Sequence, residues 1–331
     1  MTSLTRTELT RTRNDVRLLD LKPKVEDFRA AVLHGLAATP KVLPPKFFYD
    51  TRGSELFNAI CETPEYYVTR TELALLDKIG PEIAQLTGAH ASVIEFGCGS
   101  SEKIRKLLTL LDAPADYVAI DISRDQLLQS ADEIAIEFED VHVSAICADF
   151  AQRLQIPKAF CAGSGRRLAF FPGSTIGNQT PDEALDFLKI VHETVGPKGA
   201  LLIGVDLKKD VAILNAAYND SAGVTAAFNL NLLHRMKAEL GADVDPEAFE
   251  HHAFFNEGVG RIEMHLYARA AQKLRINGAS FDFAKGESIH TECSYKYEIE
   301  QFRALVAKAG FRPVQSWTDE NRLFSIHYLE A

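Results

Sequence analysis

Short apolar runs alternate with amphipathic stretches through the middle of the chain. Five of these runs predict buried strands: Val93–Phe96, Asp116–Asp121, Val141–Ala148, Arg167–Pro172 and Leu201–Leu207. Apolar residues at helical spacing lie between them, as in the predicted helix Pro181–Val195. Strands that alternate with helices are most simply arranged as a right-handed, mainly parallel sheet. The pattern therefore predicts an α/β fold, Rossmann-like and doubly wound.

The regular alternation stops after Leu207. Residues Ala212–Leu240 are predicted to be largely helical, with a polar interruption at Ala217–Gly223. Three strand-like stretches follow, at Arg261–Arg269, Gln272–Ile276 and Ser288–Tyr297. The sequence thus predicts an inserted α+β region at about Lys208–Lys296.

The C-terminal segment restores the α/β pattern. A helix is predicted over Ile299–Ala309, and Val314–Thr318 and Leu323–Leu329 are predicted to close the sheet as an antiparallel pair. A chain of 331 residues is long for one domain, so either two domains or one large elaborated domain is expected. The predicted boundaries are a mobile tail at 1–20, a nucleotide-binding domain at 71–207 and 297–331, and a second domain at 21–70 and 208–296.

Two loops rich in aromatic residues precede the first central strand. The segment Met1–Asp15 is rich in Thr and Arg and has no core pattern, which underlies the predicted tail. A helix is predicted at Lys24–Leu36, and the aromatic loops follow at Leu43–Ser54 and Thr63–Arg70. The loops either pack between helices or form a lid over a small ligand, and the sequence leaves both open.

Composition indicates an ordinary globular protein, with 46% hydrophobic and 25% charged residues. The net charge of −10 argues against a nucleic-acid partner, which would favour a basic face. The five cysteines are scattered and odd in number, which indicates reduced thiols in a cytoplasmic protein. No apolar stretch approaches the ~20 residues that span a bilayer, and no signal peptide is visible. We expect a monomer that binds neither nucleic acid nor membrane.

A glycine turn follows the first central strand directly. Gly97 and Gly99 form a G-x-G turn, and Ser100 or Ser101 can cap the next helix. The third glycine of a dinucleotide fingerprint is replaced by Glu102, whose carboxylate would lie close to a diphosphate. S-adenosylmethionine (SAM) has no phosphate, and its sulfonium is positive. An E-x-G-x-G turn with acidic neighbours therefore suits SAM better than a dinucleotide.

Polar residues end the next strands at the same edge. Asp121 closes the second strand, 24 residues after Gly97, where a carboxylate accepts hydrogen bonds from the ribose hydroxyls. A helix N-cap is the alternative role for Asp121. Asp149 and Phe150 end the third strand and suit the edge and face of an adenine, and the polar loop Gly173–Asn178 follows the fourth.

Histidines near acidic residues raise the question of a metal. The candidates are His251–His252 and His290–Glu292, but neither is accompanied by a second cluster with ligand spacing. We therefore expect solvated or hydrogen-bonded roles for them, structural roles for Glu263 and His265, and no metal.

Seven further motifs are spread from about Leu36 to the C-terminus. They are Tyr49–Phe57 (YDTRGSELF), Pro64–Tyr67 (PEYY), Gly97–Lys103 (GCGSSEK), Phe171–Asn178 (FPGSTIGN), Ala217–Asp220 (AYND), Arg261–His265 (RIEMH) and His290–Ser294 (HTECS). Together they resemble one enzyme family, the histidine-specific Nα-methyltransferases of ergothioneine biosynthesis, which form hercynine (Nα-trimethylhistidine). The implied fold is a class I methyltransferase sheet with a second, substrate-binding domain.

The resemblance implies a set of residues for each ligand. The residues implied for the methyl donor SAM, which leaves as S-adenosylhomocysteine, are Tyr49, Gly97, Lys103, Asp121, Asp149, Phe150 and Ser174. For histidine, Glu292 and Ser294 would bind the imidazole and Met264 would line its pocket. The amino-acid end would be held by Tyr66, Gly173, Asn178 and Tyr218, of which Tyr66, Asn178 and Gly173 are the implied catalytic residues.

The implied reaction is SAM-dependent Nα-trimethylation of free L-histidine, through its mono- and dimethyl forms. Relatives that methylate an indole-bearing amino acid are expected to lack an acidic imidazole partner, so Glu292 and Met264 favour histidine. The α-amine must lose a proton, which Tyr66 or water near Asn178 could relay. Two alternatives stay open: Nα-methylation of another aromatic amino acid or small amine, and a non-catalytic SAM-binding module.

Overall fold

The computed structural model describes residues 9–12, 14–23, 26–99 and 101–331, and the chain divides into two compact units. Unit 1 holds the described residues up to position 23, Arg70–Leu207 and Tyr297–Ala331. Unit 2 holds Glu26–Thr69 and Lys208–Lys296. Each unit therefore joins segments that are far apart in the sequence.

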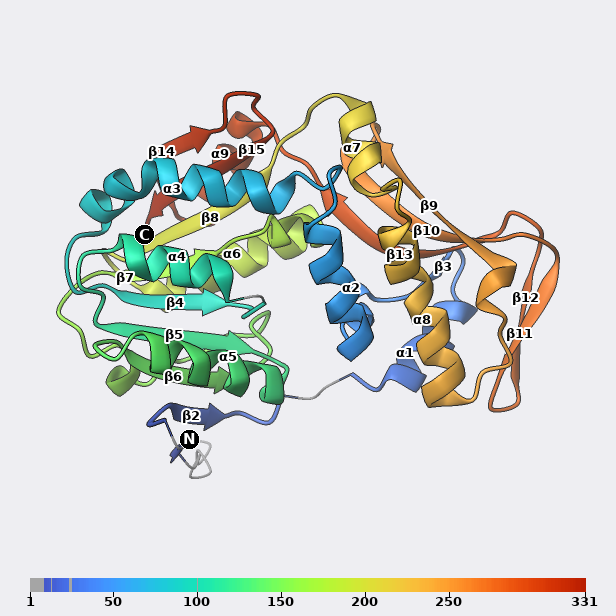
Figure 1. Cartoon of the computed structure of the whole chain (residues 1–331), viewed down its shortest axis with the longest axis horizontal. Helices are drawn as coiled ribbons and strands as arrows, with labels where there is room; N and C mark the ends of the chain where they lie inside the picture. Colours follow the sequence, from blue (N-terminus) through green and yellow to red (C-terminus); the bar gives the residue numbers. More distant parts are fainter. Residues whose placement is uncertain (1–8, 13, 24–25, 100) are drawn as a thin grey trace. The chain divides into compact units, whose positions relative to one another are not determined.

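Unit 1 is built on one nine-stranded sheet in the order β1-β2-β6-β5-β4-β7-β8-β15-β14. The six strands from β2 to β8 in that order run parallel, whereas β1, β15 and β14 pair antiparallel. The predicted α/β, Rossmann-like fold is confirmed (Figure 1). The strands are β1 (Leu9–Arg11), β2 (Arg17–Asp20), β4 (Ser92–Phe96), β5 (Asp116–Asp121), β6 (His142–Cys147), β7 (Arg167–Phe171), β8 (Ala200–Asp206), β14 (Arg312–Thr318) and β15 (Phe324–Glu330).

Helices connect these strands, and Figure 1 shows α4 and α5 side by side over β4–β6. Helix α6 begins where the sequence predicts it, because Thr180 and Glu183 form a reciprocal capping box and Pro181 occupies the first turn. The helices and short 3₁₀ turns are α3 (Val68–Thr87), α4 (Glu102–Leu110), α5 (Arg124–Glu137), η2 (Lys158–Phe160), η3 (Thr175–Asn178), α6 (Pro181–Val195) and α9 (Ile299–Lys308).

The core of unit 1 lies along the central strands. Every residue of β4 and β8 is buried, as expected for parallel strands covered on both faces. Continuous burial explains why these strands read as apolar runs and not as alternating patterns. Because β4 and β8 both run parallel to β7, their carboxyl ends lie at the same edge of the sheet.

The N-terminal segment corrects one prediction. Strand β2 pairs in parallel with β6, and β1 pairs with β2, so residues 9–12 and 14–20 are not a mobile tail. Val16 is fully buried and Leu18 is nearly so. These few apolar side chains attach the segment to the sheet edge although its composition is polar. Residues 1–8 and 13, which the predicted tail also included, lie outside the described residues.

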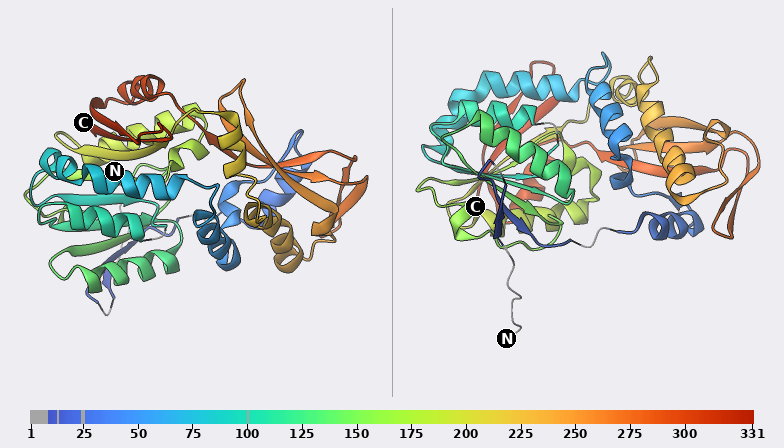
Figure 2. Two further views of the ribbon diagram at one scale, coloured as in Figure 1. Left: turned by 45° about the horizontal axis from the view of Figure 1, so that its top comes forward. Right: turned by 60° about the horizontal axis from the view of Figure 1, so that its bottom comes forward.

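Unit 2 contains a four-stranded sheet in the order β3-β13-β10-β9 and a separate hairpin of β11 and β12. Helix α8 packs against β9 and β10 (Figure 2). Strand β3 pairs in parallel with β13, which joins the N-terminal segment to the insertion. The elements are α1 (Phe28–Ala37), β3 (Lys41–Val42), η1 (Pro45–Phe48), α2 (Thr51–Cys61), α7 (Val211–Ala217), α8 (Val224–Leu240), η4 (Pro246–Ala248), β9 (Phe249–Asn256), β10 (Arg261–Ala268), β11 (Gln272–Ile276), β12 (Ala279–Phe283) and β13 (Ser288–Tyr295).

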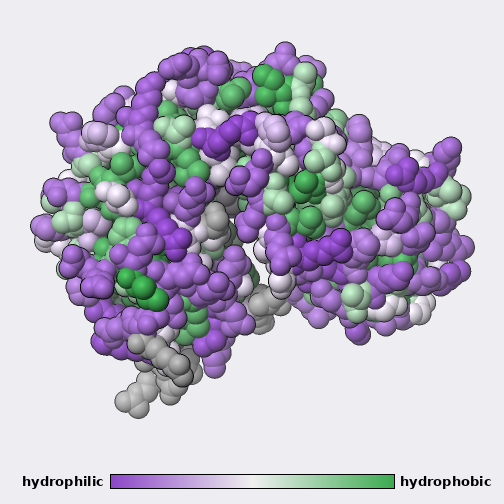
Figure 3. Space-filling model, in the orientation of Figure 1, coloured by the Kyte–Doolittle hydropathy of each residue, from purple (hydrophilic) through white to green (hydrophobic). Residues whose placement is uncertain are grey.

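The surface carries no long apolar helix. Within the described residues, none of the helices combines the length and apolar character needed to cross a membrane. The face shown in Figure 3 is mostly hydrophilic, with apolar side chains in small groups. Large hydrophobic side chains exposed in the described part of the chain are Leu21, Tyr49, Ile122, Ile136, Ile213 and Val259.

Candidate functional site

The glycine turn lies at the carboxyl end of β4, as predicted. Gly97 has a φ of 82°, a conformation that strains residues with a side chain. Its N–H donates to the Ile120 carbonyl at 2.8 Å, and a Cβ at this position would lie 3.5 Å from the Phe150 ring. The helix that follows has Ser101 at its N-cap but no side-chain capping bond, while Ser100 lies outside the described residues. The turn thus exposes main chain beside an aromatic ring.

Asp121 holds this turn against the neighbouring strand. Its Oδ2 accepts from the Cys98 N–H at 3.0 Å, and its Oδ1 accepts from the Ser123 N–H at 2.8 Å. Burial raises the pKa of Asp121, and these backbone hydrogen bonds oppose that rise. The N-cap of α5 is Ser123, so Asp121 does not take the alternative role of helix N-cap.

Asp149 and Phe150 follow β6 at the same edge of the sheet. Asp149 accepts from the Ala151 N–H at 3.0 Å, which orders the backbone just beyond the strand. The Phe150 ring lies 5.8 Å from that of Phe187 and 6.4 Å from that of Phe96, both roughly edge to face. One side of Phe150 is therefore anchored in the core, and its ring edge faces Gly97.

Glu95 does not act as the acidic neighbour that the E-x-G-x-G pattern suggested. Its side chain is buried within β4 and accepts from the Tyr117 hydroxyl at 2.6 Å. Burial raises the pKa of Glu95 to about 8. The group is therefore mainly protonated at neutral pH and offers little negative charge to a ligand.

A buried ion pair supports the loop after β7. Glu72 of α3 is 1% exposed, and its carboxylate lies 2.6 Å from Nζ of Lys103 on α4. Both carboxylate oxygens also accept from the Gly173 N–H, at 2.9 and 3.0 Å. Gly173 has a φ of 78°, and a Cβ there would lie 3.3 Å from Nζ of Lys103. Glu72, which no sequence pattern singles out, thus holds two predicted site residues, Lys103 and Gly173.

The rest of the loop is held from β8. Ser174 has a φ of 56°, and its Oγ accepts from the Asp206 N–H at 2.9 Å. Asn178 ends η3 four residues later. The structure therefore places eight predicted residues at the carboxyl ends of β4–β7 or on the helix after β4, all in unit 1: Gly97, Lys103, Asp121, Asp149, Phe150, Gly173, Ser174 and Asn178.

A second group of predicted residues gathers in unit 2. The Tyr218 hydroxyl donates to Oγ of Ser294 at 3.0 Å. Nζ of Lys296 donates to both, at 3.1 Å to Tyr218 and 3.0 Å to Ser294. Lys296 is 2% exposed and was not selected from the sequence, since a lone lysine at a strand end gives no signal. This buried cation makes the group electrostatically distinct from an ordinary core.

His251 supports the same group from β9. One ring nitrogen pairs with the Tyr218 carbonyl at 2.8 Å and the other with the Asn229 amide at 2.9 Å. Burial lowers the pKa of His251, which favours the neutral ring. The hydrogen-bonded role predicted for His251 is confirmed.

A β-bulge determines which way Glu292 faces. Strands β10 and β13 pair Met264 with Glu292 and then His265 with His290, so Thr291 is the extra residue. Directly paired residues share a face, and adjacent residues take opposite faces. Met264 and Glu292 therefore lie on one face, and His265 and His290 on the other. Regular pairing would have put His290 on the Glu292 face.

Burial raises the pKa of Glu292 from 4.5 to about 7, while the nearby charge of Lys296 acts in the opposite direction. Glu292 also raises the pKa of Tyr66, so the two side chains lie near each other in unit 2. The carboxylate is thus destabilised in the folded protein unless a ligand supplies a hydrogen-bond donor.

We expect Glu292→Gln to stabilise the protein at high pH. Because the folded-state pKa is raised, ionisation of Glu292 destabilises the fold; the cost is absent below about pH 4.5 and complete above about pH 7. The neutral variant should gain on the order of 1–3 kcal/mol at pH 8 and little at pH 4.5. Thermal unfolding across this range measures the difference, and an equal gain at both ends would contradict it.

Two tyrosines complete the predicted set. Tyr66 is 8% exposed, and its ring lies 6.2 Å from that of Tyr218. Burial raises the pKa of Tyr66 well above 10, so its phenol is neutral at physiological pH. Tyr49 is 44% exposed and packs edge-on against Phe57 and Phe228. Tyr49 belongs to unit 2, whereas the other residues predicted for the donor belong to unit 1.

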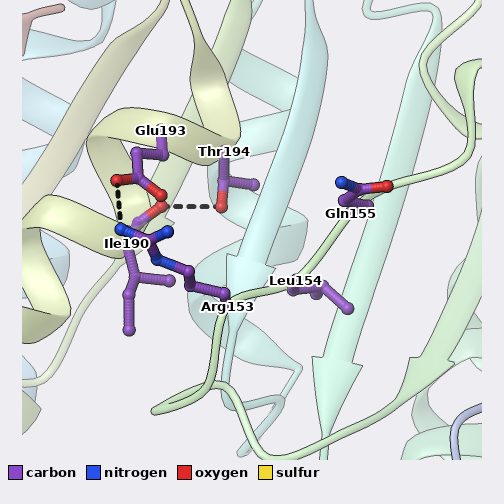
Figure 4. Close-up of a pocket in the computed structure, with 6 residues that line it drawn as sticks. All are labelled: Arg153, Leu154, Gln155, Ile190, Glu193 and Thr194. Atoms are coloured by element: carbon purple, nitrogen blue, oxygen red, sulfur yellow. Dashed lines mark hydrogen bonds and ion pairs between the residues drawn. The ribbon is translucent and has the colours of Figure 1, made fainter. Parts of the chain in front are cut away.

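A surface pocket of unit 1 lies apart from all predicted residues (Figure 4). The Arg153 guanidinium pairs with Glu193 at 3.1 Å across it, and the Thr194 hydroxyl donates to the Ile190 carbonyl at 2.7 Å. Its lining residues are Arg153, Leu154, Gln155, Ile190, Glu193 and Thr194. The Arg153, Glu193 and Thr194 side chains in this lining are therefore already paired.

The antiparallel strand β15 lies between β8 and β14, beside the six parallel strands from β2 to β8 in the sheet order. Together with the glycine turn and Asp121 it defines a class I methyltransferase. The chain belongs to the histidine-specific, SAM-dependent methyltransferase family, whose family model matches residues 28–331.

Individual relatives agree with this family. A histidine N-alpha-methyltransferase of Mycolicibacterium smegmatis is 44% identical over 303 residues, which cover 89% of this chain and 92% of the relative. Ergothioneine biosynthesis protein 1 of Neurospora crassa is 29% identical over 88% of this chain and 33% of its own length. A 4-dimethylallyltryptophan N-methyltransferase of Claviceps purpurea is 28% identical over 90% of this chain and 93% of the relative.

Proposed function

We propose that this protein transfers methyl groups from SAM to the α-amine of free L-histidine, giving hercynine as the first step of ergothioneine biosynthesis. Family membership and the 44% identical relative support a histidine-directed reaction. The observation that carries the substrate assignment is Glu292, a carboxylate whose pKa burial raises to about 7, on the same face as Met264. An imidazole N–H would supply the hydrogen-bond donor that a buried carboxylate requires.

Unit 1 supplies the groups that suit the methyl donor. Gly97 and Gly99 leave the main chain open to a ligand, since a Cβ at Gly99 would meet no atom within 4 Å. Asp121 fits the ribose hydroxyls, Lys103 fits the donor's carboxylate, and Phe150 fits the adenine. SAM supplies an activated methyl group on a sulfonium, and its thioether leaves without acid assistance. The protein's main contribution is then orientation, with the amine held about 3–3.5 Å from the methyl carbon on the S–C axis.

Unit 2 supplies the groups that suit histidine. Glu292 would accept the imidazole N–H, Ser294 would bind the ring's other nitrogen, and Met264 would pack against the ring. For the amino-acid end we propose the residues that the family resemblance implies, Tyr66, Gly173, Asn178 and Tyr218. A site with buried polar groups rejects analogues that leave those groups unpaired, which gives selectivity over phenylalanine of similar shape.

Initial rates of S-adenosylhomocysteine release, measured with single amino acids, test the proposal. Histidine should give turnover, and tryptophan and phenylalanine should give rates near the no-substrate background. The Claviceps relative makes tryptophan the sharpest comparison, because its name gives an indole substrate. Turnover with tryptophan alone would replace the histidine assignment by the first alternative. Donor binding without turnover would favour a SAM-binding module.

We expect Tyr66→Phe to weaken histidine use while leaving SAM binding unchanged. Tyr66 keeps a neutral phenol, so it can donate or relay a hydrogen bond but is not a ready-made base. Loss of one neutral hydrogen bond costs about 0.5–1.5 kcal/mol, which lowers kcat/KM for histidine about 2- to 12-fold. Tyr267→Phe is the matched control, because Tyr267 lies on the face of β10 opposite Met264. A Tyr66→Phe variant with full rate and normal histidine affinity would remove Tyr66 from the site.

A further inference from the structure

Three side chains that can ligate a metal gather on the face of the unit 2 sheet opposite Met264 and Glu292. Glu263 and His265 come from β10 and His290 from β13, and one ligand atom of each lies within 4.8 Å of the others. Nε2 of His265 lies 3.3 Å from Oε2 of Glu263. This is about the distance between two ligand atoms on one tetrahedral zinc ion with bonds of about 2.0–2.1 Å.

Each imidazole has its second nitrogen held by an oxygen. Nδ1 of His265 lies 3.0 Å from the Ser288 hydroxyl, and Nε2 of His290 lies 2.9 Å from the backbone carbonyl of Glu292. Metal-bound histidines usually have such a partner, which fixes the ring's orientation and tautomer.

Glu263 is fixed in the same way. Its Oε1 accepts from Arg261 at 2.8 Å and from the Asn256 amide at 3.1 Å. Oε2 is left facing His265. Glu263 is only 8% exposed, and its ion pair with Arg261 holds the carboxylate in place. One carboxylate oxygen is thus fixed facing the His265 ring.

We propose that Glu263, His265 and His290 bind a divalent first-row transition cation, with zinc(II) the best match to two imidazoles and a carboxylate. Softer sites would use thiolates, and magnesium or calcium sites would use oxygen alone. The centroids of the stacked His265 and His290 rings lie 4.8 Å apart, and a small shift of each ring about its hydrogen-bonded nitrogen would bring both ligand nitrogens within bonding distance of one ion. The site lies on the face of the sheet opposite Met264 and Glu292, and the metal proposal does not depend on the proposed methyl transfer.

Zinc binding to the untagged, full-length chain tests the proposal. After dialysis against zinc(II) and then against metal-free buffer, elemental analysis should find about one zinc per chain. Competition with a chromophoric chelator should show at least about tenfold weaker binding in His265→Asn and in His290→Asn. His252→Asn is the matched control, because His252 pairs with His265 in the sheet but is exposed and lies outside the three-residue set.

Circular dichroism of each variant establishes that it is folded before zinc is measured, and Glu263→Gln provides a third variant if either histidine variant unfolds. The proposal is overturned if the wild-type chain retains no zinc. It is also overturned if the folded ligand variants retain as much zinc per chain as the wild type. Equal loss of zinc in His252→Asn would also overturn it, because the metal would then lie elsewhere on this face.

Discussion

Replacing Glu292 by alanine should lower kcat/KM for histidine about 10- to 150-fold. A hydrogen bond to a charged group contributes about 1.5–3 kcal/mol, and each 1.4 kcal/mol is about tenfold. The variant lacks the proposed imidazole partner and leaves a gap about the size of a water molecule beside Met264. SAM affinity should stay within about twofold of the wild-type value, since the residues proposed for the donor lie mainly in unit 1. Steady-state kinetics with calorimetric SAM titration separates the two effects.

The matched control is Glu250→Ala, on strand β9 of the same sheet. Glu250 forms an ion pair with Arg269, and both side chains are more than half exposed, so its removal should change histidine kinetics little. A Glu292→Ala variant that kept its histidine kcat/KM but lost SAM affinity would contradict the assignment. In that case Glu292 would be part of the donor site.

Replacing Glu72 by glutamine should cost about 3–5 kcal/mol of the free energy of unfolding of unit 1. The change removes one charge of a buried pair and leaves the Lys103 ammonium, 12% exposed, without its counter-ion. Trp317 is the only tryptophan in the chain and lies in β14 of unit 1, so its fluorescence reports urea unfolding of this unit. The Gly173 loop should also lose order, which would weaken SAM binding.

Two further variants show whether the charge itself is responsible. Adding Lys103→Met to Glu72→Gln removes both charges and should recover most of the lost stability, though not SAM binding. Asp77→Asn breaks the neighbouring pair with Lys106, whose side chains are 60% and 27% exposed, and should cost less than about 1 kcal/mol. If Glu72→Gln were as mild as Asp77→Asn, the ion pair would not support the loop.

Hydrophobic pattern was sufficient to predict the central fold. Strands β5 and β11 and helix α6 have the predicted limits. A nearly continuous buried run marks β5, alternation marks β11, and a capping box with helical periodicity marks α6. Strands β9 and β12 were not predicted, since β9 carries Glu250, His251 and His252 in succession and only the face toward α8 is apolar. Strand β2 was missed because its segment is polar apart from a few apolar side chains.

The candidate site was predictable where the chain itself places residues at strand ends, as for Gly97 and Asp121. Glu72 and Lys296 were beyond reach, because their roles depend on contacts across 101 and 78 positions of sequence. The bulge at Thr291 was also hidden, since strand alternation alone would put His290 and Glu292 on one face. Sequence spacing therefore could not show that β10 and β13 bring His265 and His290 together.

Tandem mass spectrometry of the product tests the central claim most directly. The protein is incubated with SAM and an equimolar mixture of free amino acids in which histidine carries nitrogen-15 only at the α-position. We expect one product, histidine that carries three added methyl groups, and its fragmentation should release nitrogen-15 trimethylamine. Methyl groups retained on the imidazole fragment, or a methylated amino acid other than histidine, would contradict it.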